Sequence, residues 1–506
     1  MTDQVAVVNF TITASGTFSI TDPSITETFS AAILIYTAST SDGSDNAHAI
    51  MGIGFVAPDT TPTTEEEGAC FHAQNGQNTA PNTATRHVNT AAISIGDPTV
   101  NTAATEVVRV VYSANVSGGV QLNATTFTGA FNVKGVAILF AGLTRAYTDG
   151  CTASTIGAAE SVGGATQFQP DLVIFVASDG AVNTNQNDAV PNIGFALNKT
   201  GIPQVSSYQN WDDATEPSDS DGYIRSANAY THDSAGLRSS GALSGVEHST
   251  VTAFTATGFS HTSSAGSPDA HYLALKFSGA IRMACANMTT SGSTGNQDFT
   301  AFGFVPDLVL GMSTLLTSLD TLTDPANSMG YFATGSHGSR AATIHTEEGL
   351  TLAGAVVANS HTRQEDVALL TYTGSGGIAQ RATWVSGGTP NRDGFRLNFT
   401  TATSGYLTAL GIALGIKETE SVTVSDAQAF AAEHKLVATE SVLVSDALSS
   451  RISLLASESV LISDSFVLDT TTVQTGALQP FGVTATPGVA RASTVQAGPA
   501  FGVTAG

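Results

Sequence analysis

The sequence is poor in charged residues, and basic residues are the scarcest of them. Lysine and arginine number 18 against 42 aspartates and glutamates, which gives a formal net charge of −24, and charged residues make up 12% of the chain. Proteins that wrap nucleic acid need clustered lysine and arginine to displace counterions, and anionic membrane surfaces attract basic segments. We therefore expect neither nucleic acid nor a membrane among the partners of this chain.

Cysteine is also scarce, and long apolar runs are missing. The three cysteines, Cys70, Cys151 and Cys285, form no CxxC pair, so we expect small core residues and not a disulfide or a metal site. No run approaches the 18 apolar residues that a membrane-spanning helix needs. The opening residues Met-Thr-Asp-Gln lack the basic and apolar regions of a signal peptide, which predicts synthesis in a cytoplasm.

Catalytic motifs are missing as well. The sequence contains no HExxH, no GxSxG, no P-loop and no GxGxxG between a strand and a helix, and its 11 histidines are scattered without metal-ligand spacing. The pair Asp219 and Asp221 resembles part of a calcium loop, but Pro217 stands where the first ligand belongs and no glutamate closes the loop. We therefore expect no enzyme, no catalytic residue, no metal and no cofactor.

What the sequence does contain is an internal repeat, with copies about 136 to 140 residues apart. Phe168–Ile174 (FQPDLVI) returns as Phe304–Leu310 (FVPDLVL), and Gly258-Phe259 returns as Gly394-Phe395. A more diverged first copy supplies Ile53-Gly54-Phe55, which matches Ile193-Gly194-Phe195 and Met329-Gly330-Tyr331. Landmarks in the same order at a constant offset indicate a triplicated domain.

The composition of these copies favours strands. Glycine numbers 50, threonine, serine and valine are abundant, and apolar runs of strand length occur at residues 31–37, 172–177 and 308–312. Such runs are typical of central strands that are buried on both faces. We predict an all-β protein of three tandem sandwich-like modules: module one at 1–143, module two at 144–280 and module three at 281–416.

The composition changes after residue 416. Glu420–Asp426 (ESVTVSD) recurs as Glu440–Asp446 and Glu458–Asp464 within residues 417–470, and FGVTA occurs at 481–485 and 501–505 within residues 471–506. We predict an extended C-terminal arm of short strands that docks onto a neighbouring protein or onto the parent modules, because no single repeat can bury enough surface to stand alone. A disordered linker is the alternative. The residues expected to mediate assembly are Val422, Val424, Val442, Val444, Val460, Ile462, Phe481 and Phe501.

Polar stretches between the strands are candidate binding loops. Residues 39–48, 57–85, 178–192, 209–222 and 313–327 are rich in Asp, Asn, Thr, Ser and Gly and recur at comparable places in the modules. Trp211, Asp212 and Asp213 form an aromatic-acidic group of the kind that contacts sugars, so they are the candidate ligand-binding residues. Trp384 lies in an apolar strand pattern and is expected in a core.

The phrase F-x-P-D-L-V, followed much later by Gly-Phe, resembles a "GF-x-PD-x-VW" repeat of structural proteins in tailed bacteriophages. It covers modules two and three, with Ile174 or Leu310 where that repeat has tryptophan, and module one lacks the Pro-Asp. The resemblance implies a non-enzymatic, surface-exposed virion component made in the host cytoplasm.

Among virion components, a tail appendage such as a fibre or tip is the first expectation, and a capsid decoration protein is the alternative. The implied partners are other virion structural proteins and further copies of this chain, with a host-surface glycan as another candidate. A carbohydrate-binding surface adhesin and a glycoside-cleaving tail spike are the rival hypotheses from other classes.

Overall fold

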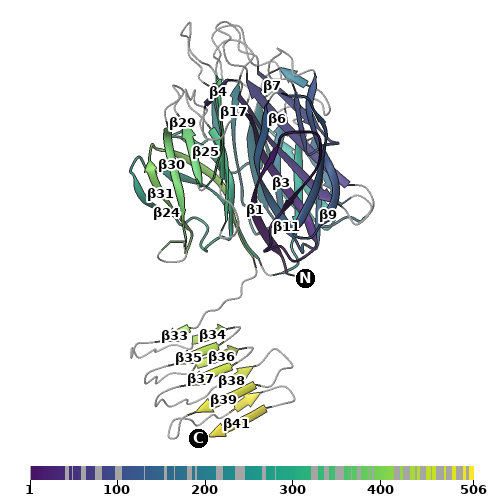
Figure 1. Ribbon diagram of the computed structural model, residues 1–506. Coiled ribbons are helices and arrows are strands. Elements are labelled where there is room, and N and C mark those ends of the chain that lie inside the picture. The colour runs from purple at the N-terminus through teal and green to yellow at the C-terminus, as the bar shows by residue number, and fades with distance from the viewer. Residues whose placement is uncertain are drawn as a thin grey trace. The chain divides into compact units, whose positions relative to one another are not determined.

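The computed structural model is built from β-strands and divides into two compact units, residues 1–415 and 416–506 (Figure 1). In unit 1 it describes residues 2–39, 45–47, 49–58, 64–73, 83–96, 105–129, 131–152, 157–163, 166–178, 185–187, 191–211, 220–233, 246–264, 269–279, 281–320, 329–335, 341–347, 358–365, 367–372, 378–386, 388–389 and 393–414. In unit 2 it describes the strands alone. Within these residues no helix is long and apolar enough to span a membrane.

Module one contains a large and a small antiparallel sheet. The large sheet has the order β1-β11-β3-β5-β6-β7, and the small sheet has the order β2-β10-β9-β8. The strands are β1 (Gln4–Ile12), β2 (Gly16–Thr21), β3 (Phe29–Ser39), β4 (Asp45–Ala47), β5 (Ala49–Pro58), β6 (Thr64–Ala73), β7 (Thr83–Val88), β8 (Ile93–Gly96), β9 (Glu106–Val116), β10 (Gly119–Phe127) and β11 (Asn132–Ala141).

Module two repeats this arrangement with large-sheet order β12-β22-β14-β16-β17-β18 and small-sheet order β13-β21-β20-β19. Its strands are β12 (Arg145–Thr152), β13 (Ala158–Ser161), β14 (Leu172–Ser178), β15 (Asn185–Asn187), β16 (Asn192–Leu197), β17 (Gln204–Trp211), β18 (Ser220–Arg225), β19 (Tyr230–Asp233), β20 (Val246–Thr255), β21 (Gly258–Ser263) and β22 (Asp269–Lys276).

Module three has the same topology again, with large-sheet order β23-β32-β25-β26-β27-β28 and small-sheet order β24-β31-β30-β29. Its strands are β23 (Ile281–Thr290), β24 (Gly295–Phe299), β25 (Leu308–Thr314), β26 (Met329–Gly335), β27 (Ala341–Glu347), β28 (Ala358–Glu365), β29 (Leu369–Tyr372), β30 (Ile378–Val385), β31 (Phe395–Thr401) and β32 (Gly405–Leu414). Three modules of identical strand order confirm the predicted all-β fold of sandwich-like modules.

The apolar strand runs serve two different cores. Along β14, Leu172, Ile174 and Val176 enter a core that all three modules share, whereas Val173 and Phe175 enter the core between the two sheets of module two. Alternate residues of a strand point to opposite faces, so a run without polar interruption means that both faces are buried. The shared core likewise receives Ile33 and Ile35 from module one and Leu308, Leu310 and Met312 from module three. The three large sheets therefore pack around one another.

Each module also lends a short segment to the large sheet of a neighbour. In module one β4 pairs with β28 of module three, and in module two β15 pairs with β7 of module one. In module three the backbone N–H of Asp320 donates to the carbonyl of Ile224 in β18 of module two, at 2.9 Å. The acceptor strands β7, β18 and β28 hold equivalent places in their sheets. Module two therefore donates to module one, module one to module three, and module three to module two. This pattern is a closed ring of head-to-tail contacts.

Repeated glycines mark places where two backbones meet. A Cβ on Gly119, Gly258 or Gly394 would lie 2.2, 1.8 and 1.8 Å from the carbonyl oxygens of Ile20, Glu160 and Phe299, in that order. Carbon and oxygen atoms cannot approach this closely, so a side chain at these positions would push the outermost strand away from its small sheet. The Gly-Phe landmarks of the repeat are therefore packing requirements.

All five predicted polar stretches overlap with strands. The stretch 39–48 contains β4, the stretch 178–192 contains β15, and the stretch 313–327 begins with the last two residues of β25. The stretch 57–85 includes β6 and the start of β7, and the stretch 209–222 includes the end of β17 and the start of β18. The prediction of an exposed loop at 57–85 was wrong because it took the glutamates as a sign of exposure. Glutamate is rarely buried without a partner, yet Glu66 and Glu67 of β6 are both buried. Residues 59–63, 74–82 and 212–219 lie outside the described residues.

Unit 2 is a stack of parallel strands in two sheets, ordered β33-β35-β37-β39-β41 and β34-β36-β38-β40. Phe481–Ala485 lies in register on the identical Phe501–Ala505. The repeats predicted to form an extended arm thus pair with one another, as in solenoids whose repeats contact their neighbours. The strands are β33 (Val422–Val424), β34 (His434–Ala438), β35 (Ser441–Val444), β36 (Ile452–Ala456), β37 (Ser459–Ile462), β38 (Thr472–Gln474), β39 (Phe481–Ala485), β40 (Thr494–Gln496) and β41 (Phe501–Ala505).

Candidate functional site: polar networks at the module seams

The aspartate of the F-x-P-D motif fastens the central strand of a module to its closing strand. The carboxylate of Asp171 accepts from the backbone N–H of Phe277 at 3.0 Å, and that of Asp307 accepts from the N–H of Leu414 at 2.8 Å. Lys276 adds an ion pair to Asp171 at 2.6 Å. Carboxylates at chain corners satisfy N–H groups that have left the sheet ladder. The repeated aspartates thus have an architectural role.

Module one makes a comparable contact with a serine, one residue further along its closing segment. Its register pairs Ala31 with Phe140, which corresponds to the pairs of Leu172 with Leu275 and of Leu308 with Ile412 in the other modules. The preceding residue is Ser30, whose hydroxyl accepts from the N–H of Leu143 at 3.1 Å. The Pro-Asp that the first copy lacks is therefore replaced by a shorter acceptor at the same corner.

The contacts between modules, called seams below, differ in their polar residues. At the start of the chain, Asp3 accepts from the backbone N–H groups of Ser278 and Gly279 at 3.0 and 2.8 Å and from the Ser278 hydroxyl at 2.7 Å. These two residues belong to the connection between modules two and three. Three donors on one buried carboxylate fasten the first strand of module one to that connection.

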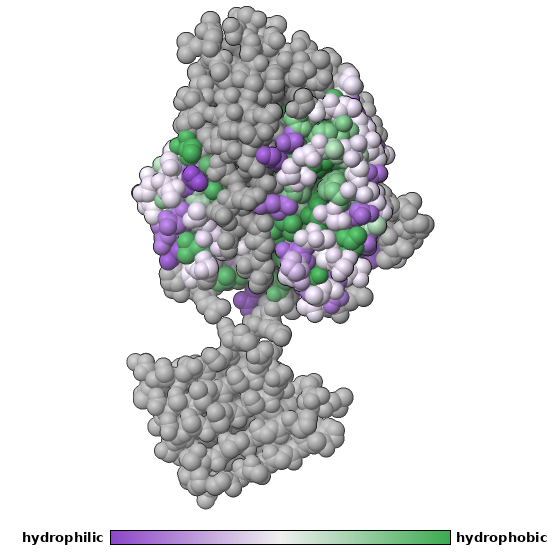
Figure 2. All heavy atoms as spheres, in the orientation of Figure 1, coloured by the Kyte–Doolittle hydropathy of each residue, from purple (hydrophilic) through white to green (hydrophobic). Residues whose placement is uncertain are grey.

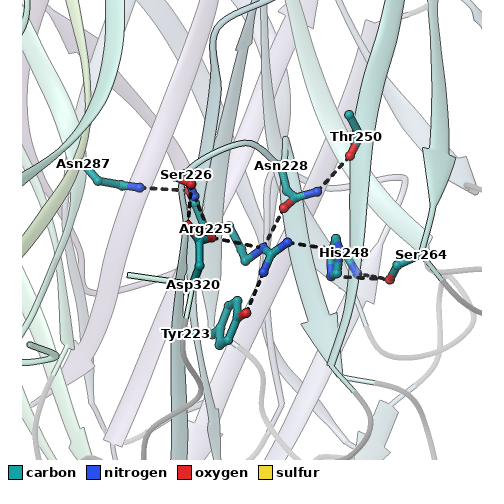
Figure 3. A network of polar contacts seen from close by, with 9 residues as sticks. All are labelled: Tyr223, Arg225, Ser226, Asn228, His248, Thr250, Ser264, Asn287 and Asp320. Atoms are coloured by element: carbon teal, nitrogen blue, oxygen red, sulfur yellow. Dashed lines mark hydrogen bonds and ion pairs between the residues drawn. The ribbon is translucent and has the colours of Figure 1, made fainter. Parts of the chain in front are cut away.

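A network around Arg225 lies at the seam of modules two and three (Figure 3). The guanidinium donates to Asn228 Oδ1 at 2.6 Å and to the Tyr223 hydroxyl at 2.5 Å, and its Nη2 lies 3.2 Å from His248 Nε2. It also lies over the Tyr223 ring, 5.0 Å from the centroid. The planar guanidinium is suited to this role because it offers several donors in fixed directions.

Module three contributes two residues to this network (Figure 3). Asp320 accepts from the Ser226 hydroxyl at 2.5 Å and pairs with Arg225 Nε at 3.6 Å, and Asn287 Nδ2 donates to the Arg225 carbonyl at 2.9 Å. Asp320 has a φ of 53°, a left-handed conformation that aspartate tolerates better than most residues. The sequence carried no signal for this network, because its members come from separate polar segments without characteristic spacing.

A buried chain of three titratable groups lies at the seam of modules one and two. Glu67 Oε2 lies 2.6 Å from His271 Nδ1, and His271 Nε2 lies 3.2 Å from His87 Nδ1. Glu67 and His87 come from β6 and β7 of module one, and His271 comes from β22 of module two. Burial raises the pKa of Glu67, partly offset by His271, whereas burial and the nearby His271 hold the pKa of His87 well below its usual value.

A second buried carboxylate, Glu66, points away from that seam. Its Oε1 accepts from the backbone N–H of Tyr112, and burial raises its pKa to about 8 in spite of the charge of Arg109. Nearby, Glu106 pairs with Arg109 at 3.1 Å and with Arg86 at 3.5 Å. These contacts lie inside module one, so they contribute to its stability and not to the seams.

The candidate ligand-binding residues are only partly placed. Trp211 is the last residue of β17, where its backbone pairs with Ser220. Its side chain, together with Asp212 and Asp213, lies outside the described residues. Trp384, expected in a core, stacks on Phe395 of module three with centroids 5.7 Å apart.

The cysteines were predicted to be small core residues. Cys70 and Cys151 are buried, Cys285 is half-buried, and all three are free thiols. Within the described part of the chain, no group of three or more His, Cys, Asp and Glu side chains is arranged to hold a metal ion. Of the scattered histidines, His87 and His271 are brought within 3.2 Å of each other by the fold.

The candidate assembly residues form columns in the five-stranded sheet of unit 2. The backbone positions of Val422, Val442 and Val460 are in register, as are those of Val424, Val444 and Ile462, and Phe481 pairs with Phe501. The repeats are thus strand partners for each other. Docking of these residues onto another protein stays a prediction.

No family model, curated protein or solved structure matches this chain. The class that the fold defines is an all-β protein of three sandwich-like modules in ring contact, two of which donate a strand to a neighbour, with a separate stack of parallel strands.

Proposed function

We propose that the chain is a non-enzymatic structural component of a bacteriophage particle, exposed on the virion and serving as a tail appendage such as a fibre or tip. The observation that carries the proposal is the role of the motif that resembles phage structural proteins. Asp171 and Asp307 of that motif bind backbone N–H groups of their own modules. A motif with this role suits a scaffold.

The seams support the same proposal. Asp3, Asp320 and His271 each have their polar partners in another module or in an intermodule connection. Together with the shared core, these contacts join three modules into one body, as a particle component exposed to shear requires.

The surface is compatible with a virion exterior. On the face drawn in Figure 2, weakly polar residues cover much of the described surface, and strongly hydrophilic ones are scattered. Among the described large apolar side chains, Ile378 is the exposed one, at 39%. Such a surface stays soluble with few charges. Because its described part exposes only this one large apolar side chain, we assign attachment to other virion proteins, or to further copies of the chain, to unit 2. There the outer strands β33 and β41 each have one neighbour among the described strands.

Immunogold electron microscopy of particles from the producing cells tests this function. Antibodies against residues 1–415 should label tails, and particles that carry a deletion of residues 416–506 should lose the label because the attachment is lost. Label on the shell would assign the chain to capsid decoration. Unlabelled particles would refute a virion role.

A glycan array tests the rival adhesin hypothesis. That hypothesis depends on Trp211, Asp212 and Asp213, so binding that falls on Trp211→Ala would support it. A glycoside-cleaving spike would in addition depolymerise host capsule. Under the proposed scaffold role, no such activity is expected.

A further inference from the structure

The seam of modules one and two places three titratable side chains in contact without solvent. Glu67, His87 and His271 are 2%, 0% and 1% exposed. The equivalent position to His271 is Val136 in module one and Thr408 in module three, as the registers of β11, β22 and β32 show. The buried histidine pair is therefore specific to one seam and is not part of the repeated architecture.

The two facing imidazole nitrogens are close enough for a hydrogen bond, which needs a proton on one of them and not on the other. His271 Nε2 and His87 Nδ1 are 3.2 Å apart, and their ring centroids are 5.3 Å apart. If one nitrogen is protonated, it donates to the other. If both nitrogens carry a proton, the two N–H groups oppose each other and the hydrogen bond is lost, and a protonated His87 places a positive charge in a buried site.

The surroundings offer little compensation for a positive charge on His87. Facing this group, β6 carries Glu67, β7 carries His87 and β12 carries Asp149, which acts on Glu67. Asp149 is already an acceptor for the Tyr147 hydroxyl and the Gly150 N–H. The neighbouring strands β5 and β14 have no titratable side chain, and Arg86 of β7 turns to Ser94 and Glu106.

We propose that Glu67, His87 and His271 form an acid-sensitive latch, which closes the seam between modules one and two at neutral pH and loosens it as the pH falls toward 5. In the open seam an exposed histidine takes up a proton near pH 6.5, whereas the closed seam keeps His87 neutral. The opening equilibrium therefore rises up to tenfold for each pH unit below 6.5, or about 30-fold at pH 5.

Glu67 opposes this effect and provides an internal check. Burial raises the pKa of Glu67, so the closed seam takes up that proton more readily than the open one, and acid favours closure through this residue. Removing the carboxylate should leave the full effect of His87, whereas removing His87 should leave only the opposing effect of Glu67. The two substitutions are thus expected to shift the acid response in opposite directions.

Hydrogen exchange of the full chain, expressed as protection factors at pH 7 and pH 5, tests the latch. In the wild type, β12 and β22 of module two, which lie outside module one and its Glu66, should lose protection at pH 5, while β30 and β31 of module three keep theirs. His87→Asn, which keeps an acceptor near the Nδ1 position, should abolish the loss, and Glu67→Gln should bring it to about 30-fold. His434→Asn in unit 2 is the matched histidine control and should leave the loss unchanged.

Three results would overturn the proposal. One is unchanged protection of β12 and β22 in the wild type, a measurement that needs no variant to fold. Another is an equal loss in all three modules, which would indicate general acid unfolding. The last is a loss that persists in His87→Asn or that disappears in Glu67→Gln.

Discussion

Replacing Glu66 with glutamine is expected to stabilise module one by an amount that grows with pH. Glu66 is 8% exposed, and burial raises the pKa of its carboxyl group from 4.5 to about 8. Between these values the folded protein holds a proton that the unfolded chain has released. The contribution of this group to stability is therefore fully present below pH 4.5 and is lost as the pH rises to 8.

The magnitude follows from the size of the shift. Each pH unit is worth about 1.4 kcal/mol, so a rise from pH 4.5 to 7 costs the wild type up to about 3 kcal/mol. Glutamine does not titrate, and its amide oxygen can still accept from the N–H of Tyr112. The free energy of unfolding of Glu66→Gln relative to the wild type should thus increase by about 2 to 3 kcal/mol from pH 5 to pH 7 and level off above pH 8.

Hydrogen exchange of β6 and β9 against urea concentration at pH 5, 6, 7 and 8 measures this difference locally. Glu106→Gln is the matched control. Glu106 pairs with Arg109 and Arg86, so its loss should destabilise the module at neutral pH by about 1 kcal/mol. A stability difference for Glu66→Gln that stays constant from pH 5 to pH 8 would refute the reasoning.

Three further predictions concern the corners, the glycines and the exchanged segment. Asp171→Ala should cost about 1 to 3 kcal/mol in urea unfolding because the N–H of Phe277 loses its acceptor, and Asp171→Asn should recover most of it; equal losses would contradict the hydrogen-bond account. Gly258→Ala should displace β13 and abolish the protection of that strand in hydrogen exchange. Gly150→Ala is the control and should leave protection unchanged, because its Cβ would lie 3.9 Å from the nearest atom, the carbonyl oxygen of Ala270. Similar behaviour of the two variants would argue against the close approach at Gly258. Asp320→Ala should speed exchange in β18 by several-fold without altering β7, and an unchanged β18 would speak against a contribution of this contact to the seam.

The module fold could be predicted because its main determinants repeat in the sequence. A run such as Leu172–Ser178 has apolar residues at successive positions, which is typical of a strand covered on both faces. The turn glycines and the Pro-Asp corners recur because the same close approach and the same unpaired N–H occur in each module. At Ser30 the side chain still accepts a backbone hydrogen bond, but the residue type differs from the aspartate of the other modules. The repeat was therefore not recognisable at this position.

The seams could not be predicted for a different reason. Contacts between modules join residues that are far apart in the sequence, such as Glu67 and His271, and no local pattern encodes such a pair. The exchanged strand β15 is three residues long and polar, so neither hydropathy nor length distinguishes it from a loop. Tertiary context decides these elements, and a single sequence contains little of it.

The C-terminal repeats illustrate how much a repeat alone can indicate. Their short alternating strands and near-constant spacing were sufficient to predict that each needs a strand partner. They did not reveal that the partner is the next repeat, because parallel pairing in register also arises between separate chains.

The cyclic transfer of β4, β15 and the Asp320 segment has a consequence for how such a chain can change in length. A fourth module could not be inserted, nor one deleted, without leaving a donated segment with no acceptor and an acceptor edge with no donor. Duplication by recombination is therefore blocked in the ring, whereas a column of stacked turns tolerates gain or loss of single turns. Changes in chain length among descendants of this gene should accumulate after residue 415, and the number of modules before it should stay at three.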